Sequence, residues 1–535
     1  MSLFSWCIYG AEGKKRGTGF TDTPSDQRRD DWIRTSDHRT PSPVRYQTAP
    51  RPVKELNLVY PSSYLLAPSC RRDWVTISMR KFDLIIIGGG TAGTAAAIRA
   101  EAFGARTALV ESGKLGGGTV NLGCVPTKRL FWAGESSYAA SDGIDYHAAT
   151  AAARQAMEKT RLQNFEWPMA RLRNLTRFRG RARFVGPTEV TIGEEALHGD
   201  AFLVATGSVP QAPSIEGLDD LECLSEGDWL EMARLPRSLI IIGGGAQGLE
   251  FAQVFAHFGT EVTVLQRGSQ VLSGFEPEVA VSLADCLRAE GISIRISESP
   301  RAVRWYGSEK EVATLTNDGE RIYRAEEILP AVGRVAGTAG LGLEEIGVEI
   351  DNRGAVLVDD ELASSLPHIY AAGDVRGGPM IENAAHKEGL VAAENALGRR
   401  GIHIDYEAIP SCVFTHPQAA RVGLTESDAA YRRHPVETRI VDYSDLPKAI
   451  ISGDLRGLIK MTVDKRTRRV LGCSVLGASA AEIVHEAALA IKYSLTVEDL
   501  ASLDRIYPSY SQITGLVAER FVEPRVVARR PRRAA

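Results

Sequence analysis

The sequence has few cysteines, and none are paired at a spacing that holds a metal. Seven cysteines are spread over 535 residues without a Cys-x-x-Cys motif. An odd number of scattered thiols argues against both a zinc site and a disulfide framework. It is typical of a reducing compartment, so we expect a cytoplasmic protein. The seven are Cys7, Cys70, Cys124, Cys223, Cys286, Cys412 and Cys473.

Long apolar runs and an excess of charge of either sign are also lacking. No run reaches the roughly 18 apolar residues of a membrane span. The formal net charge of −4 offers no attraction to nucleic acid or to an anionic membrane surface. The hydrophobic fraction of 44% and the charged fraction of 24% are those of an ordinary globular protein.

Residues 1–78 lack the periodicity of a helix or a strand. They are rich in Arg, Pro, Ser and Asp, as in RRDDWIRTSDHRTPSPVRYQTAPRP. No apolar stretch there is long enough for a secretory signal. We expect either a disordered extension or an over-extended gene model that truly starts at Met79, because Met79 opens onto the strand-like MRKFDLIIIGGG.

Glycine is plentiful, with 51 residues, and two glycine-rich turns sit in similar surroundings. FDLIIIGGGTAGTAAAIRAEAFGARTALVE and SLIIIGGGAQGLEFAQVFAHFGTEVTVLQR each read as strand, turn, helix and strand. This order predicts a βαβ unit, used twice. From about residue 404 the pattern changes to alternating strands and Ala-rich helices, which indicates a separate α+β domain. The predicted fold class is α/β, with two Rossmann-like dinucleotide-binding domains and a C-terminal α+β domain.

The first module carries Gly-x-Gly-x-x-Gly at Gly88, Gly90 and Gly93. Such glycines allow a tight turn, let the backbone approach a pyrophosphate, and place the phosphates at a helix N-terminus. Glu111 ends the next strand, 23 positions after Gly88. A carboxylate there accepts hydrogen bonds from a ribose with a free 2′-hydroxyl, which predicts FAD or NAD at this site.

The second module has its glycines at Gly243, Gly245 and Gly248. The position of the acidic residue is taken by Gln266, and Arg267 follows it. A carboxylate would repel a 2′-phosphate, whereas an arginine pairs with it. We therefore expect NADPH here, with NADH as the alternative.

Together with GCVPTK at 123–128, both modules make the chain similar to the class I pyridine nucleotide-disulfide oxidoreductases, over roughly residues 79–521. That family includes glutathione reductase, lipoamide dehydrogenase and mercuric reductase. ATGSVP at 205–210, IYAAGDV at 369–375 and VFTHPQAARVGLTE at 413–426 resemble further family motifs in the same order. The resemblance implies a homodimer whose active site is shared between two chains.

The resemblance also assigns domains and cofactor contacts. The expected parts are 79–225 and 346–403 for FAD, 226–345 for NAD(P)H, 404–523 for dimerisation, and 524–535 as a basic tail. Asp374 falls on the ribityl-phosphate side of the flavin, and the backbone of Ala182 falls beside adenine. The other expected contacts are Gly118, Thr119, Lys128, Thr206, Gly207, Glu250 and Gly333.

The departures from the family pattern concern its thiol chemistry. Members that reduce disulfides carry Cys-x-x-x-x-Cys, whereas this chain has Thr119 at the first position and Cys124 at the second. Threonine cannot form a disulfide, so an internal dithiol relay cannot operate through this pair. Near the C-terminus the family's His and Glu are replaced by Tyr507 and Gln512, in RIYPSYSQ. A tyrosine with a pKa near 10 is a poor base at neutral pH.

The residues expected to handle hydride remain. Lys128 matches a family lysine near the flavin N5 atom, and Glu250 matches the carboxylate that pairs with it. An ammonium there stabilises the negative charge of a reduced flavin. Ala246 stands where other members place a bulkier gate over the flavin.

Three roles remain open for Cys124. The helix N-terminus and Lys128 are expected to lower its pKa, so that its thiolate tunes the flavin through charge transfer. It could instead cycle through a sulfenic acid, or pack inertly under the flavin.

The sequence therefore predicts an FAD-dependent NAD(P)H oxidoreductase without a disulfide relay. Electrons pass from reduced flavin to a small diffusible acceptor, such as a quinone, a metal complex, oxygen or a second nicotinamide, collected near Cys124 and Tyr507. One alternative is a mercuric or dithiol reductase, such as a dihydrolipoamide dehydrogenase-like enzyme, in which Cys412 or Cys473 replaces the missing thiol. The other is a flavin-binding dimer without catalysis.

Overall fold

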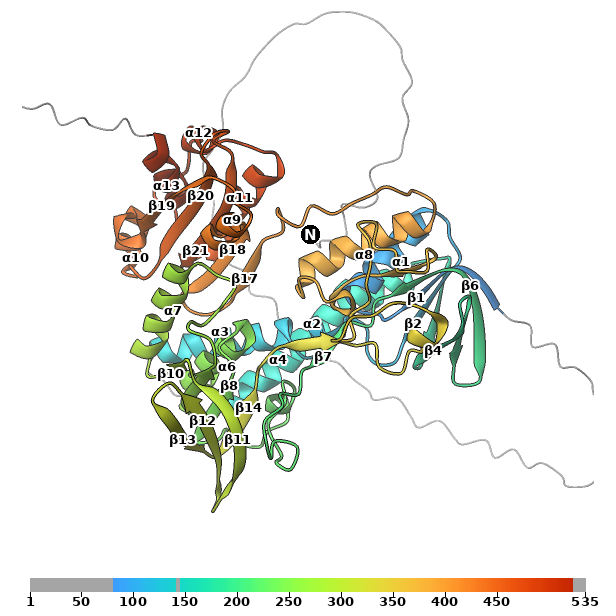
Figure 1. Cartoon of the computed structure of the whole chain (residues 1–535), viewed down its shortest axis with the longest axis horizontal. Coiled ribbons are helices and arrows are strands. Elements are labelled where there is room, and N and C mark those ends of the chain that lie inside the picture. The colour runs from blue at the N-terminus through green and yellow to red at the C-terminus, as the bar shows by residue number, and fades with distance from the viewer. Residues whose placement is uncertain (1–79, 141–144, 523–535) are drawn as a thin grey trace, which may run out of the picture. The chain divides into compact units, whose positions relative to one another are not determined.

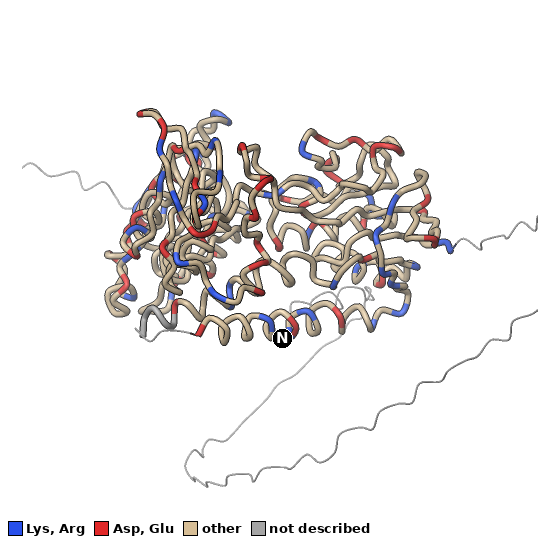
Figure 2. Tube along the Cα trace, turned by 90° about the horizontal axis from the view of Figure 1, so that it is seen from below, with Lys and Arg blue, Asp and Glu red and all other residues tan. Residues whose placement is uncertain are grey.

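The computed structural model describes residues 80–140 and 145–522, and only the backbone of 136–140. The expected extension at 1–78 and the basic tail at 524–535 lie outside the described residues. Within the described part, no helix is both long enough and apolar enough to cross a membrane. Figure 2 shows basic and acidic residues interspersed along the described chain.

The first glycine-rich module builds a mostly parallel sheet of seven strands. Its order is β3-β2-β1-β6-β5-β4, and β16 pairs with β6. Pairs β1–β2, β1–β6, β2–β3 and β6–β16 are parallel, while β4, β5 and β6 pair antiparallel. The strands are β1 (Arg80–Ile87), β2 (Thr107–Glu111), β3 (Leu175–Arg179), β4 (Ala182–Gly186), β5 (Glu189–Ile192), β6 (Glu195–Val204) and β16 (Ile369–Ala371).

Helices pack on this sheet because its central strands are apolar on both faces. Leu84, Ile85 and Ile86 of β1 are fully buried. Helix α1 (Thr91–Ala102) packs along α8 (Glu382–Ala396), as Figure 1 shows, and its alanines let the two backbones approach. The other helices of this part are α2 (Gly117–Asn121), α3 (Cys124–Ala140), α4 (Tyr146–Arg161) and α5 (Trp167–Ala170).

The second module forms a smaller parallel sheet of order β10-β9-β8-β14, beside an antiparallel sheet of order β11-β12-β13. A two-stranded ribbon of β7 (Ser208–Pro210) and β15 (Arg334–Ala336) links the modules. The elements are β8 (Ser238–Ile242), α6 (Ala246–His257), β9 (Glu261–Gln266), α7 (Pro277–Ala289), β10 (Ser293–Ile296), β11 (Ser299–Tyr306), β12 (Glu309–Thr316), β13 (Gly319–Ala325) and β14 (Glu327–Pro330).

The C-terminal part is built on a five-stranded antiparallel sheet of order β17-β18-β21-β20-β19. Helices α11 and α13 pack against its strands, so the predicted α/β fold with a C-terminal α+β domain is confirmed. The elements are β17 (Ser411–Val413), β18 (Gln418–Gly423), α9 (Glu426–Tyr431), β19 (Val436–Asp442), α10 (Pro447–Ser452), β20 (Leu458–Asp464), β21 (Val470–Gly477), α11 (Ala480–Lys492), α12 (Val497–Ala501) and α13 (Gln512–Val522).

One apolar core joins all three parts. Leu130 of α3, Leu249 of α6 and Val413 of β17 belong to the same buried cluster. Packing of this kind resists small displacements, because a dense core has no voids to absorb them. The core therefore holds α3 and the first turns of α6 in a defined relation to β17.

Candidate functional site

The first glycine-rich turn requires glycine at two positions. Gly88 has φ = +111°, and a Cβ atom there would lie 2.2 Å from the carbonyl oxygen of Ala205. A Cβ at Gly93 would lie 1.8 Å from the carbonyl oxygen of Gly88. Helix α1 can therefore begin directly against the end of β1, with Gly90 as an N-cap that offers no side-chain bond. The backbone N–H groups of its first turn form an anion site of the kind that binds pyrophosphate.

Glu111 lies beside this turn, at the end of β2. Its Oε2 accepts a hydrogen bond from the backbone N–H of Gly89 at 2.6 Å, and its Oε1 accepts one from Gly113 at 2.6 Å. These two bonds fix the carboxylate at the sheet edge where an adenosine ribose lies in Rossmann-type sites.

Two side-chain oxygens in the same region are buried without a hydrogen-bond partner among the described residues. They are Oγ1 of Thr91, the first residue of α1, and Oγ1 of Thr206, in the loop after β6. A buried hydroxyl without a partner costs free energy, so each such group calls for an explanation. A bound FAD offers phosphate, ribityl and ring acceptors, so the residues present fit this cofactor. Asp374, which follows β16, accepts a hydrogen bond from Ser208 Oγ at 2.6 Å.

The second turn repeats this geometry with different chemistry. A Cβ at Gly248 would lie 2.1 Å from the carbonyl oxygen of Gly243, as in the first turn. Gln266 occupies the place of the glutamate, and its Oε1 accepts from the N–H of Gly244 at 3.1 Å. The neighbouring Arg267 is exposed at the end of β9. The site thus offers a neutral amide and a cation where the first offers a carboxylate.

The predicted pair of Lys128 and Glu250 comes together although 122 residues separate the two side chains. Lys128 Nζ lies 2.6 Å from Glu250 Oε2. Glu250 Oε1 accepts a hydrogen bond from the backbone N–H of Phe414 at 2.8 Å, and the ammonium lies 5.0 Å from the centroid of the Phe414 ring. Helix α3, helix α6 and the segment after β17 therefore meet at one charged cluster, which we call the Lys128–Glu250–Phe414 cluster.

Cys124 is the first residue of α3, as expected, but the expected lowering of its pKa is wrong. Although the residue is open to solvent, the protein atoms around its sulfur desolvate the thiolate and raise the pKa of the thiol. Lys128 lowers the pKa, but this effect is smaller, and Glu250 and Glu382 add to the rise. The sequence-based expectation rested on the helix start and the lysine, and it took no account of the desolvation of the sulfur or of Glu382.

Cys412 lies on β17, near the same ion pair as Cys124. Burial and Glu250 raise the pKa of Cys412 to about 12, and Lys128 lowers it. Thr119, on α2, is half-buried, and Cys473 is buried in the core of the C-terminal part. The five cysteines of the described residues are free thiols.

Tyr507 and Gln512 lie at the end of the C-terminal part. Tyr507 is 69% exposed, and within the described residues it makes no hydrogen bond or ring contact. Gln512 begins α13, where its Oε1 accepts from the N–H of Ser509 at 3.1 Å. Within one chain, Tyr507 is therefore not held against the Lys128–Glu250–Phe414 cluster by any polar contact.

A chain of polar contacts that the sequence did not reveal runs from Asp374 to α6. Arg334 donates through Nε to Ser208 Oγ at 2.7 Å, and through Nη1 to both carboxylate oxygens of Glu226 at 2.5 and 2.6 Å. Glu226 Oε2 also accepts from Gln247 Nε2 at 2.7 Å. Arg334 follows the expected contact Gly333, but no local pattern marks Glu226, which lies 108 residues earlier.

Comparison with known proteins identifies the family. The family described as pyridine nucleotide-disulphide oxidoreductase matches residues 82–389, and its dimerisation domain matches residues 409–517. The chain belongs to this family. Its members are FAD-dependent NAD(P)H oxidoreductases, which confirms the predicted enzyme class and both predicted cofactors.

Several relatives align over nearly their whole length. The chain is 36% identical to a mercuric reductase of Streptomyces lividans over 461 residues, which are 82% of this chain and 96% of the relative. It is 34% identical to a dihydrolipoyl dehydrogenase of Thermus scotoductus over 453 residues, covering 81% and 96%. Among solved structures, it resembles the HOCl-induced flavoprotein disulfide reductase RclA from Escherichia coli, with a TM-score of 0.74 and 27% identity over 82% of this chain and 99% of that one.

Proposed function

We propose that this pyridine nucleotide-disulphide oxidoreductase passes electrons from NAD(P)H through FAD directly to a small diffusible acceptor, without an internal disulfide relay. The observation that carries the proposal is the combination of an intact Lys128–Glu250–Phe414 cluster with Thr119 in place of a second thiol. When bound, FAD accepts a hydride from the nicotinamide and gives up electrons to the acceptor.

The residues of the chain divide this work between them. Glu111 and the first turn hold the adenosine and pyrophosphate of FAD, and the second turn with Arg267 holds the phosphate end of NADPH. Glu250 fixes the Lys128 ammonium through a short ion pair, so that the positive charge stays in place when negative charge develops beside it. Because Ala246 is small and exposed, the approach to this cluster from α6 is open.

The acceptor side contains Cys124 and, by the proposal, Tyr507 of a second chain. The exposed position of Tyr507 suits a homodimer in which each chain completes the other's site. Since desolvation of its sulfur raises the pKa of the Cys124 thiol, an inert or weakly tuning role is favoured over a thiolate that is ionised at neutral pH. The few, free cysteines favour a cytoplasmic location.

A second candidate function rests on Cys412. The charges of Lys128 and Glu250 act on the pKa of this thiol as they do on that of Cys124. In this second candidate, Cys412 and Cys124 form a dithiol that reduces disulfides or mercuric ion. Cys473, fully inside the core of the C-terminal part, is a much poorer partner.

Anaerobic titration with NADPH and then NADH, followed through the flavin spectrum, separates these functions. Complete bleaching after two electrons per FAD supports direct transfer, and an acceptor screen beginning with quinones follows. Four electrons per FAD, reduced to two by Cys412→Ser but not by the control Cys286→Ser, establish the dithiol instead. Failure of both coenzymes to bleach bound FAD leaves only a binding role.

A further inference from the structure

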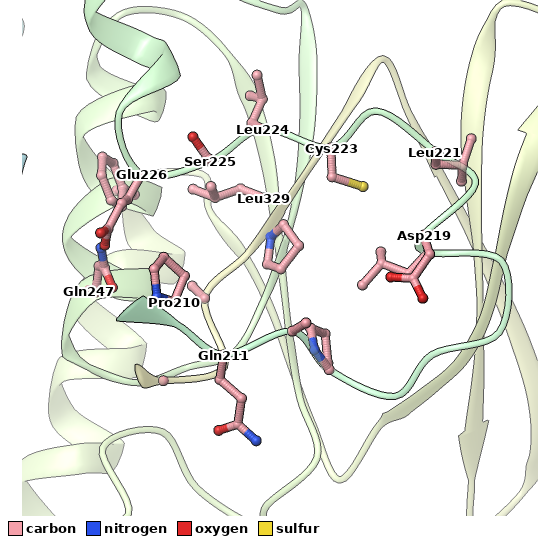
Figure 3. Close-up of a pocket in the computed structure, with 17 residues that line it drawn as sticks. Pro210, Gln211, Asp219, Leu221, Cys223, Leu224, Ser225, Glu226, Gln247 and Leu329 are labelled. Atoms are coloured by element: carbon pink, nitrogen blue, oxygen red, sulfur yellow. The ribbon is translucent and has the colours of Figure 1, made fainter. Parts of the chain in front are cut away.

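A cavity of about 360 Å³ lies between the linker at 210–226, the end of β14 and the first turns of α6. Figure 3 shows Gln211, Asp219, Glu226 and Gln247 around it. Most of the remaining lining is proline, leucine and Phe251, and the two charged side chains are both acidic. A cavity of this size and composition suits an uncharged or cationic ring and disfavours a phosphate.

The cavity lies where a dinucleotide would present its ring. Strands β8 and β14 are neighbours in the parallel sheet, and the cavity is lined by residues at the carboxyl end of β14. Ligands of open α/β sheets bind at this end. Gln247 lines the cavity and lies one helical turn before Glu250 on α6, so both project from neighbouring positions of one helix face. The end of the cavity that Gln247 lines is therefore about one helical turn along α6 from Glu250.

Glu226 determines how the Gln247 amide is oriented. A carboxylate only accepts hydrogen bonds, so the side-chain nitrogen of Gln247 must face Glu226, as the distance of 2.7 Å to Oε2 records. Figure 3 shows the same orientation, with the nitrogen toward Glu226 and the oxygen directed away. The amide oxygen of Gln247 is thus left as a hydrogen-bond acceptor beside the cavity.

Glu226 is itself held in place. It is 12% exposed and pairs with Arg334, which also binds the hydroxyl and the carbonyl oxygen of Ser208, each at 2.7 Å. Ser208 in turn donates to Asp374. Polar contacts with the ribbon that links the two modules therefore fix the orientation of Gln247. The same contacts continue to Asp374, on the proposed flavin side.

We propose that Gln247 accepts a hydrogen bond from the carboxamide N–H of the nicotinamide ring, and that Glu226 is the positioning residue that fixes Gln247 for this role. The inference rests on the proposed function, because it deepens the binding of NAD(P)H at the same site. A nicotinamide ring then enters the cavity in one orientation, with its carboxamide at Gln247 and its reactive edge toward Glu250.

Equilibrium binding of oxidised coenzymes tests this without turnover. The probes are NADP⁺ and its 3-acetylpyridine analogue, in which a methyl group replaces the amide NH₂, or the corresponding NAD⁺ pair. Binding is followed through the change that each causes in the flavin spectrum of the holoenzyme. We expect the wild-type protein to bind NADP⁺ about 3- to 10-fold more tightly than the analogue, the value of one hydrogen bond.

The variants separate the acceptor from its positioning residue. Gln247→Leu should bind both coenzymes equally, because the acceptor is gone. Glu226→Gln keeps the size of the side chain, but the new amide can either accept or donate a hydrogen bond. The orientation of the Gln247 amide is then no longer fixed, and the preference for NADP⁺ over the analogue falls. Asp220→Asn, an exposed acid of the same linker that does not line the cavity, should keep the full preference.

Two results overturn the inference: no preference in the wild-type protein, or a full preference retained in Gln247→Leu. Failure of the proposed function looks different, because the titration of the wild-type protein would then either leave the flavin unreduced or take up four electrons per FAD. Among the described residues, the hydrogen bond of Gln247 is to Glu226 and not to Arg334 or Ser208, so its variant tests the acceptor even if Glu226→Gln disturbs the linking ribbon.

Discussion

The Lys128 ammonium contacts the carboxylate of Glu250 and the ring of Phe414, and we propose that its charge acts on the bound flavin. We expect Lys128→Met to slow flavin reduction by NAD(P)H by about 10²-fold, the usual effect of removing one preorganised electrostatic contact. Anaerobic stopped-flow measurement of flavin bleaching gives this rate. Lys114→Met, at an exposed lysine without an ion pair in the described chain, is the control. Equal rates in both variants would contradict the role.

Arg267 and Gln266 replace, at the second turn, the acidic chemistry of the first. Arg267→Ala should weaken the binding of NADPH about tenfold and change that of NADH little, because only NADPH carries a 2′-phosphate. The ratio of the two KM values measures this effect. Arg301→Ala, an exposed arginine of β11, is the matched control. An equal loss of binding for NADPH and NADH would show that Arg267 does not bind the 2′-phosphate.

The Cys124 thiol has a pKa above its usual range because the protein atoms around its sulfur desolvate the thiolate, although the residue is open to solvent. Only the thiolate reacts with iodoacetamide, so its alkylation should rise about tenfold per pH unit up to at least pH 9. Peptide-resolved mass spectrometry follows Cys124 separately from the other thiols. An alkylation rate that is already constant below pH 8 would show that Cys124 is ionised there, and would support the charge-transfer role of its thiolate.

At the scale of elements, a second charged network ties the start of the C-terminal part to α3 and α7. His416 lies 2.8 Å from Glu135 of α3 and 3.5 Å from Asp454. Arg456 joins Asp454 to Glu290, at 2.8 and 3.2 Å. The hydrogen bond to His416 lowers the pKa of Glu135, so this carboxylate stabilises the fold when it is ionised.

This network predicts a defined loss of stability in acid. Because the folded pKa of Glu135 is lowered, its contribution is complete above the unfolded pKa and disappears as the pH falls from there through the folded value. Glu135→Gln should lower the free energy of unfolding by about 1 kcal/mol at pH 7 and by less at pH 4. Urea unfolding at both values measures it, with the exposed Glu194→Gln as control. A loss of unfolding free energy that is larger at pH 4 than at pH 7 would contradict the lowered pKa of Glu135.

At the scale of the whole molecule, the matched dimerisation domain exposes several large apolar side chains. Leu503 is 51% exposed, Ile506 81% and Leu489 55%. We expect Ile506→Glu to shift the protein from dimer to monomer, because a buried unpaired charge opposes association. Sedimentation velocity at several concentrations measures this, with Ile322→Glu on β13 as control. Dimers that persist in Ile506→Glu would place the interface elsewhere.

Local sequence patterns were sufficient to predict much of the fold. The two glycine turns, their flanking strands and the contrast between Glu111 and Gln266 all lie within single βαβ units, where sequence separation is short and backbone geometry demands particular residues. That residue 119 cannot take part in a disulfide was equally plain, because a threonine has no thiol.

Contacts between the modules could not be predicted from local sequence. The pKa of Cys124 depends on burial and on Glu250 and Glu382, which lie far away in the chain, so reading the helix start and Lys128 alone predicted the wrong direction. The brace from Asp374 through Ser208, Arg334 and Glu226 to Gln247 has no local pattern either. The two nucleotide-binding turns could be predicted from local sequence, because each meets a short-range requirement of the backbone. Which side chains of one module face those of the other depends on packing around the shared core, because such long-range contacts form only where the modules fit together.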